Sequence, residues 1–462
     1  MPVTGTASLK PIALPDFGVP RLIPKIAAAT YQARFARFMD RLAAKGFDAA
    51  VVYADREHCA NISWMTGFDP RFEEALLVAV RGKDPVIITG PENVGLAAVT
   101  PLGACSLLWP GFGLLGQDRT KAVALPDLLA KAGLERGHRI GAVGWKYFLT
   151  NEIADAVQAV DLPAYIAAML AAIGPVTNAT GIFMNPVDGL RAEIEIEELA
   201  RFEFLATHGS ESVKRVIFGL KPGMTEFEAA SLMRPLGYPL SCHPMLSTGE
   251  RARFGLGSPS DTEIERGTKF TTAFGYQGTL TARAGYVVES VDELPAAARD
   301  YADAFVACYW EAAAEWYETV GIGVTGGEID ARMRARLDND FFKLALNPGH
   351  LIHIDEWMHS PIRPGSTETL RSNQAIQIDM IPAPGNAYFT TNIEDGIALL
   401  DERGRAEFAE RFPEAWGRIE ARRAFMANDL GIRVKPEVLP FSNLAGWLPA
   451  YLLNPGLAIS RV

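Results

Sequence analysis

Two segments of the chain, one hundred residues apart, begin in the same way: residues 223–228 read GMTEFE and residues 323–328 read GVTGGE. In each segment a Thr precedes a Glu by three positions, which is the pattern of a capping box at the start of a helix. Both segments follow a long helical pattern and precede strand-like runs. The repeat predicts two related halves of helix and strand, and a chance likeness of two capped helices is the alternative.

A different pattern occupies the chain before about residue 185. Residues 31–46 (YQARFARFMDRLAAKG) carry apolar side chains at helical spacing, and the next run, DAAVVYAD, has the character of a buried strand. Further β-rich runs such as ALLVAV, PVIITG and RIGAVGW alternate with helical ones. This alternation predicts an α/β domain with a mixed or parallel sheet over residues 31–185, and a second domain over residues 186–462.

The first 30 residues are rich in proline and show little periodicity. Proline has no amide hydrogen and a fixed φ angle, so it disfavours helix interiors and central strands. We therefore expect residues 1–30 to form an extended arm, neither helix nor strand, lying over a surface. A partner subunit is one candidate for that surface.

Composition excludes several classes of protein. The chain has 462 residues, of which 48% are hydrophobic and 21% charged, as in globular proteins. Its 55 acidic and 44 basic residues give a net charge of −11, the wrong sign for binding phosphate backbones, so we expect no nucleic-acid partner. The sequence has no uncharged apolar run of about 18 residues or more, so we expect no membrane contact.

The cysteines and the start of the chain indicate a compartment. The four cysteines lie far apart, without a C-x-x-C pair, and predict free thiols rather than a zinc site or a disulfide framework. The first residues lack the basic-then-apolar order of a secretory signal. We expect a cytoplasmic protein.

Several motifs together resemble a known family. Residues 34–70, beginning RFARFMDRLAAKGFDAAVVY, are similar to the N-terminal domain of creatinase. The motifs LRAEIEIEELARFEFLA, LKPGMTEFEAA, NPGHLIH, QAIQIDMIP and TNIEDGIALL resemble, in this order, segments of the catalytic domain in the superfamily of creatinase, prolidase and aminopeptidase P. The resemblance implies an α/β N-terminal domain with a mixed sheet, an α+β pita-bread domain with a pseudo-twofold repeat, and a homodimer.

The resemblance also implies where metal ligands would lie. The metallopeptidases of the superfamily hold two divalent ions with two Asp, one His and two Glu. The positions of the two Asp, eleven residues apart, fall here on Ala273 and Ala284, whereas the His position matches His350. The two Glu positions fall on Asp379 and Glu394.

Loss of both bridging Asp removes two anionic ligands from a site that must offset about four positive charges. An ordinary dinuclear centre is therefore not expected, and we predict no metal cofactor. Creatinase is the precedent within the superfamily for a hydrolase without metal. Creatine itself is a poor candidate substrate, because the position of creatinase's catalytic His falls near Leu256.

Independently of the family, the segment GHLIHIDEWMHSP concentrates titratable groups. It holds His350, His353 and His359, three of the seven His in the chain, together with Asp355 and Glu356. His titrates near neutral pH and is the usual general acid or base. A solvated loop with chance histidines is the alternative.

A second candidate segment is SCHPMLSTGERARFGLG. His243 is a candidate for the missing catalytic His, and Arg253 for holding a substrate carboxylate by paired hydrogen bonds. Tyr276 is a candidate donor to developing charge. A surface loop and a core tyrosine are the alternatives, and Cys242 is read as a small buried hydrophobe rather than a nucleophile.

These observations support three hypotheses. The first is a metal-independent, creatinase-like hydrolase that cleaves a C–N bond of a small metabolite, with either His243 or His359 activating water. The second is an Xaa-Pro peptidase-like enzyme that holds one metal in a remodelled site, and the third is an inactive small-molecule-binding protein. We assign catalysis to His243, His350, His359 and Glu394, and substrate binding to Asp379, Tyr276, Arg253 and His353.

Overall fold

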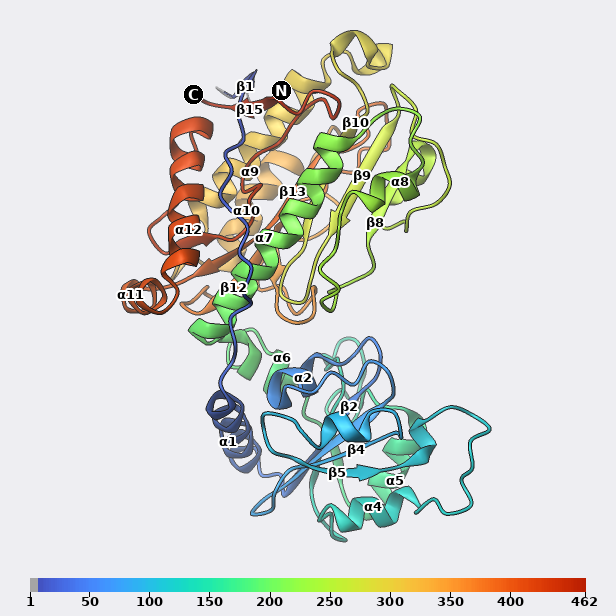
Figure 1. The fold of residues 1–462 in the computed structure, drawn as a ribbon. Helices are drawn as coiled ribbons and strands as arrows, with labels where there is room; N and C mark the ends of the chain where they lie inside the picture. The colour runs from blue at the N-terminus through green and yellow to red at the C-terminus, as the bar shows by residue number, and fades with distance from the viewer. Residues whose placement is uncertain (1–6) are drawn as a thin grey trace. The chain divides into compact units, whose positions relative to one another are not determined.

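The computed structural model describes residues 7–462, and the chain forms two compact units (Figure 1). The N-terminal unit is Ile26–Ala192. The C-terminal unit is Glu193–Val462, to which the N-terminal segment up to Lys25 also belongs. Among the residues that the structure describes, no helix is both long enough and apolar enough to cross a membrane.

The N-terminal unit contains a six-stranded sheet in the order β5-β4-β3-β2-β6-β7. The strands are β2 (Ala49–Ala54), β3 (Ala75–Val80), β4 (Val86–Thr89), β5 (Cys105–Leu108), β6 (Ile140–Val143) and β7 (Val176–Asn178). The helices are α1 (Ala28–Ala44), α2 (Ala60–Thr66), α3 (Val94–Ala97), α4 (Leu125–Lys131), α5 (Ala164–Ile173) and α6 (Gly181–Met184). β3 pairs antiparallel with β2 and β4, whereas β2–β6, β4–β5 and β6–β7 are parallel. The prediction of a mixed sheet is confirmed.

Apolar patterning explains these elements. Every residue of β3, ALLVAV, is buried, as expected for a central strand covered on both faces. In α1 the buried residues Tyr31, Arg34, Phe38 and Leu42 recur at helical spacing and form one face. The Arg34 guanidinium lies 4.7 Å from the ring centroid of Trp64 and donates to its backbone oxygen, so this buried charge is compensated.

The C-terminal unit is built around a seven-stranded antiparallel sheet in the order β11-β12-β13-β10-β9-β8, with β14 also paired to β13. The strands are β8 (Met245–Thr248), β9 (Lys269–Phe274), β10 (Thr281–Tyr286), β11 (His350–Leu351), β12 (Gln374–Asp379), β13 (Asn392–Leu399) and β14 (Val438–Pro440). The helices are α7 (Ile196–Gly219), α8 (Glu226–Ser231), α9 (Ala307–Thr319), α10 (Gly326–Leu337), α11 (Glu402–Arg411) and α12 (Pro413–Phe425). The long helix α7 packs against β9 and β10 (Figure 1).

Both repeated segments begin helices. The Thr225 hydroxyl accepts from the Glu228 amide and the Glu228 carboxylate accepts from the Thr225 amide, which completes a capping box at α8. At α10, Thr325 accepts from the amide of Glu328. The spacing of Thr and Glu therefore predicted both helix starts, but α8 has only 6 residues whereas α10 has 12.

The N-terminal segment differs from the prediction. Within it, Ser8–Pro11 is a strand, β1, that pairs antiparallel with β15 (Leu457–Ser460) of the same chain. A two-stranded edge needs few amide donors, so the proline that ends β1 does not prevent pairing. Residues 1–6 of the predicted arm lie outside the described residues.

Beyond β1, the segment contacts its own chain. The backbone oxygens of Gly18, Pro20 and Pro24 face the side chains of Asn443, His208 and Arg201 at 3.4, 2.8 and 3.1 Å. The Phe17 ring also packs edge-on against Phe425, with 5.8 Å between the ring centroids. These contacts fix the segment along α7 and α12.

Acid should destabilise the fold through His208. Burial lowers the pKa of His208, and Arg215 adds to this, which together outweigh the hydrogen bond to the Pro20 oxygen that raises it, so folding favours the neutral ring. The stabilisation is present above the usual pKa of about 6.5 and is lost as the pH falls below it. We expect His208→Gln, which keeps a donor for Pro20 but does not titrate, to lose less melting temperature between pH 7 and pH 5 than the wild type. Equal losses in the two proteins would contradict this role.

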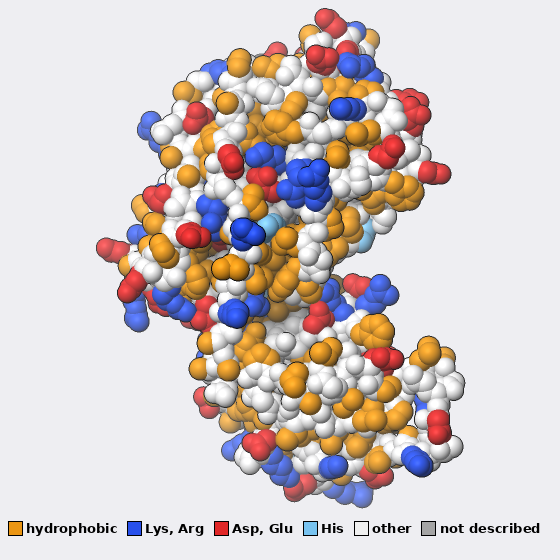
Figure 2. Space-filling view, viewed as in Figure 1, with side chains coloured by type: hydrophobic (Ala, Val, Ile, Leu, Met, Phe, Trp, Pro, Cys, Tyr) orange, Lys and Arg blue, Asp and Glu red, His pale blue; other side chains and the backbone are white. Residues whose placement is uncertain are grey.

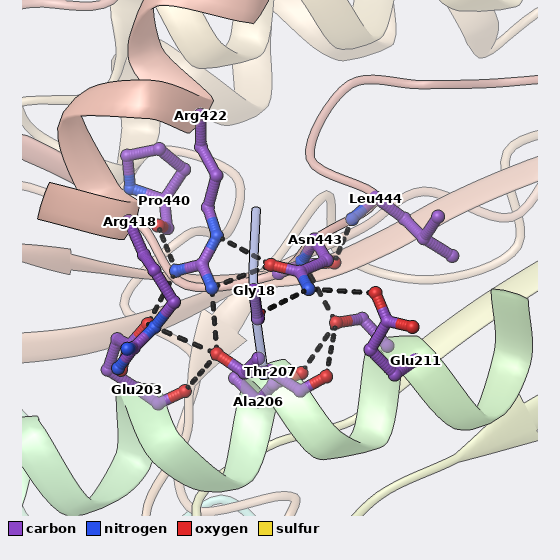
Figure 3. A network of polar contacts seen from close by, with 12 residues as sticks. Gly18, Glu203, Ala206, Thr207, Glu211, Arg418, Arg422, Pro440, Asn443 and Leu444 are labelled. Carbon is purple, nitrogen blue, oxygen red and sulfur yellow. Dashed lines mark hydrogen bonds and ion pairs between the residues drawn. The ribbon is translucent and has the colours of Figure 1, made fainter. Parts of the chain in front are cut away.

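A buried polar network joins α7, α12 and the segment after β14 (Figure 3). The Glu203 carboxylate accepts hydrogen bonds from Arg418 at 2.6 Å and from Arg422 at 2.8 Å. Arg422 also donates to Thr207 and to the side-chain oxygen of Asn443, both at 2.7 Å. One carboxylate therefore compensates two guanidinium groups away from solvent. On the outer face in Figure 2, acidic and basic side chains are instead interspersed among apolar ones.

Candidate functional site

A cavity of about 790 Å³ opens on one face of the C-terminal sheet. Side chains of β8, β9, β10, β12 and β13 line it, together with the loops 249–256 and 381–390. Because residues paired across neighbouring strands point to the same face of a sheet, the strand register describes the cavity wall residue by residue.

One row of paired residues crosses five strands of the sheet, from β12 to β8. Asp379 pairs with Glu394, Glu394 with Ala282, Ala282 with Ala273, and Ala273 with Met245. All five line the cavity. The wall is therefore acidic at β12 and β13 and apolar from β10 to β8.

A second row lies two residues further along the strands. Asn392 pairs with Ala284, and Ala284 with Thr271, and these three residues also line the cavity. Two residues beyond Thr271 on β9 lies Lys269, which lines it as well. The structure confirms that Ala273 and Ala284 face the cavity, as the family motifs implied.

Successive side chains of β10 point to opposite faces of the sheet, and the face away from the cavity is different in character. Arg283, between Ala282 and Ala284, is fully buried and donates to Asp395 at 2.7 Å and to the backbone oxygens of Trp447 and Leu444. Asp395 is therefore the partner of a structural cation, whereas its neighbour Glu394 faces the cavity.

One buried His lies against the acidic end of the cavity. His350 Nε2 lies 3.4 Å from a Glu356 carboxylate oxygen and 4.0 Å from one of Asp379. Single ligand atoms of His350, Asp379 and Glu394 lie within 4.8 Å of one another, and all three residues are buried. We call His350, Glu356, Asp379 and Glu394 the acidic cluster.

Burial and mutual repulsion disfavour the charged forms of the acids in this cluster. Burial raises the pKa of Asp379 to about 6, although His350 opposes the shift. Burial and the charges of Asp379 and Glu356 raise the pKa of Glu394 well above its usual value. Burial lowers the pKa of His350, but the carboxylates of Glu356 and Asp379 outweigh this and the pKa is raised overall.

Two buried acceptors at the cluster have no hydrogen-bond donor among the residues that the structure describes. They are Asp379 Oδ1 and Asn392 Oδ1, both on side chains that line the cavity. A buried acceptor without a donor is costly, so it marks a place for a ligand or water. The cluster with these acceptors is suited to a cation or a multiple hydrogen-bond donor.

The donor set does not fit the two ions that the resemblance implies. From Lys269 to Ala284, a span that the structure describes completely, the hairpin contributes only Lys, Thr, Leu and Ala to the cavity, and no carboxylate. If the motif were aligned two residues earlier or later, the two ligand positions would still fall on residues without a carboxylate. One ion fits the residues present, and His350, Asp379 and Glu394 would hold it.

Two further predicted residues line the cavity. His243 is exposed, and its Nε2 lies 2.9 Å from the Leu256 backbone oxygen. Arg253 is also exposed and lies on the loop 249–256 at the rim. The cavity thus brings together His243, Arg253, Asp379 and Glu394, and His350 lies directly against its acidic end without lining it.

The other three predicted residues lie away from the cavity lining. His353 is buried with its Nε2 3.4 Å from Glu198 of α7, because the chain turns directly after β11 and directs this ring to the opposite side from His350. The Tyr276 hydroxyl accepts from the Leu236 amide at 2.7 Å, inside the protein. The backbone of His359 pairs with Leu351, and its ring faces Glu368 and Arg363.

Two cavity residues escaped the sequence reasoning. Glu356 was noted in the His-rich segment without a role, because the irregular loop after β11 gives no periodicity from which its direction follows. Lys269 had a usable signal: it precedes Thr271 and Ala273 at strand spacing, so it had to share their face.

The comparisons with known proteins agree with this architecture. Residues 34–166 match the family model of the creatinase/prolidase N-terminal domain. No curated protein sequence matches the chain.

Solved structures with the same fold include peptidases of several organisms. The dipeptidase PepE from Mycobacterium ulcerans has 18% sequence identity and a TM-score of 0.58, with 81% of this chain and 95% of that chain covered. The Xaa-Pro dipeptidase from Bacillus anthracis has 17% identity and a TM-score of 0.59, covering 81% and 96%. The prolidase from Pyrococcus horikoshii OT3 has 15% identity and a TM-score of 0.60, covering 80% and 95%. The chain therefore has the two-domain pita-bread fold of the creatinase, prolidase and aminopeptidase P superfamily.

Proposed function

We propose that the protein is a metal-independent hydrolase that cleaves a C–N bond of a small cationic metabolite. The observation that supports this most strongly is the cavity wall, in which the acidic cluster faces a hairpin without carboxylates. Two buried acids and the part-buried Glu356 lie together, and the single His beside them supplies at most one positive charge. An amidinium, guanidinium or ammonium group of the substrate would supply the rest.

The residues of the cavity suit the steps of such a hydrolysis. Asp379 and Glu394 would bind the cationic nitrogen, and Asn392 Oδ1 would accept one of its hydrogens. His243, with Nε2 donating to the Leu256 oxygen, would take a proton from water through Nδ1. The water oxygen would attack the carbon, the C–N bond would break, and His350 would donate a proton to the leaving nitrogen.

The peptidases that share this fold support the general part of the proposal, that the reaction is hydrolysis of a C–N bond. They are a dipeptidase and an Xaa-Pro dipeptidase, and a peptide bond is an amide C–N bond. A second candidate is therefore an Xaa-Pro peptidase-like enzyme with one metal ion at His350, Asp379 and Glu394, favoured by the 4.8 Å spread of their ligand atoms. When bound, such an ion would act as a Lewis acid on a carbonyl oxygen.

Activity with and without chelator distinguishes the candidates. We expect the protein to release ammonia or amine from at least one member of a panel of small amidines, guanidines and ureas, at the same rate in EDTA as in buffer. Activity on Xaa-Pro dipeptides that requires added manganese or zinc would support the second candidate instead. Tight binding of the panel without turnover would point to a binding protein.

A further inference from the structure

Lys269 is a basic residue inside the cavity that the proposed reaction does not use. It lies on the cavity face of β9, and its side chain is 26% exposed. A lysine at the end of a row of Thr and Ala is not needed for packing, because a smaller or apolar residue would fill that place without burying a charge.

The environment of Lys269 holds its ammonium group only weakly. Its Nζ lies 3.5 Å from Glu250, whose side chain is 87% exposed, so solvent screens this pair. The ammonium also lies 5.7 Å from the ring centroid of Phe389. Phe389 has a φ of 62°, which is unfavourable for an aromatic residue, and this strained backbone directs its ring into the cavity.

The strand register separates Lys269 from the acidic cluster. Glu394 lies in the row of Ala273, two strands from β9, and Lys269 lies four residues along β9 from Ala273. These steps correspond to about 10 Å across the sheet and roughly 13 Å along it between backbone positions. Because the side chains span part of this distance, the opposite charges are on the order of 10 Å apart.

The cavity therefore has two charged ends. The acidic cluster is at one end, and Lys269 is at the other, with Arg253 on the loop that also lines the cavity. The wall between the two ends is formed by Ala273, Ala284 and Thr271, which add no charge.

We propose that Lys269, assisted by Arg253, is an anion subsite, and that the substrate is an elongated molecule with a cationic C–N group at one end and a carboxylate at the other. This inference rests on the proposed function, because the acidic cluster must first bind the cationic end. The carboxylate displaces the exposed Glu250 from Lys269 and sets the length of substrate that the cavity accepts.

Two probes with the same carbon chain test the subsite. Titration calorimetry of the full chain would compare 6-guanidinohexanoic acid with its methyl ester, which keeps the cation but lacks the anion. A hydrogen bond between charged groups favours the acid by about tenfold or more in Kd. We expect Lys269→Met to reduce this preference to about twofold or less and Lys269→Arg to restore most of it.

The choice of variants and a third substitution serve as controls for this test. Lys269→Met preserves the apolar stem beside Phe389, and melting curves check that both variants are folded. Glu250→Gln removes the competing carboxylate, so we expect the acid to bind more tightly to it than to the wild type. Weaker binding to Glu250→Gln would count against the subsite.

Failure of the anion subsite and failure of the proposed function would give different experimental results. If acid and ester bind the wild type equally and Lys269→Met changes neither, the anion subsite is overturned while the acidic cluster stands. If neither compound binds, the cationic end has no site, and both the proposed function and the subsite are contradicted.

Discussion

Glu203→Gln should lower the free energy of unfolding of the C-terminal unit by about 3–5 kcal/mol, the range for removing one member of a buried ion pair. The Glu203 side chain is fully buried, and its carboxylate pairs with both Arg418 and Arg422. Gln has almost the same shape but no charge. The substitution would leave the guanidinium groups of Arg418 and Arg422 without the carboxylate that pairs with both (Figure 3).

Urea denaturation of the variant measures this effect. The matched control is Glu407→Gln, which removes a carboxylate bonded to Arg411 at 2.7 Å on the surface of α11, where both side chains are about two-fifths exposed. We expect the control to lose at most about 1 kcal/mol. A loss for Glu203→Gln no larger than that of the control would show that the network does not stabilise the fold.

Glu394→Gln should abolish cation binding and activity while leaving the protein as stable as the wild type or more stable. Glu394 is buried beside Asp379 and Glu356, and burial together with these charges raises its pKa and disfavours its charged form. A neutral amide removes that repulsion. We expect kcat/KM and the affinity for a guanidinium probe to fall by about 10²-fold or more, as for other buried charge pairs.

The contrast with stability is what makes this prediction specific. Substituting a residue that serves the structure lowers the stability of the protein, whereas substituting one that serves function often does not. The control is Glu410→Gln, an exposed position on α11 outside the cavity, for which we expect no change in activity or melting temperature. A fall in the melting temperature of Glu394→Gln with probe affinity unchanged would assign Glu394 a structural role.

Local patterns predicted much of this molecule. The capping residues Thr225 and Thr325 marked helix starts, and the motifs placed Ala273 and Ala284 at one cavity, with His350 against the lining residue Asp379. In these cases the information lies within a few residues, in a side chain that caps its own helix or in the alternation of a strand.

Features that depend on distant partners were not predictable in this way. β1 forms only because Ser460 and its neighbours, at the other end of the chain, offer an edge. His353 faces α7 because of the irregular turn after β11, and Glu356 reaches His350 across the same loop. Neither direction follows from sequence spacing, because the loop has no regular period.

The most direct test of the proposed chemistry is the metal content of the purified protein after incubation with manganese, iron or zinc and removal of free ions. Because the hairpin face contributes Ala273, Ala282, Ala284 and Thr271 where bridging carboxylates would be needed, we expect well under one ion per chain and hydrolysis of a small C–N substrate that EDTA does not inhibit. One or more tightly bound ions per chain, with activity that disappears on chelation and returns with metal, would contradict it.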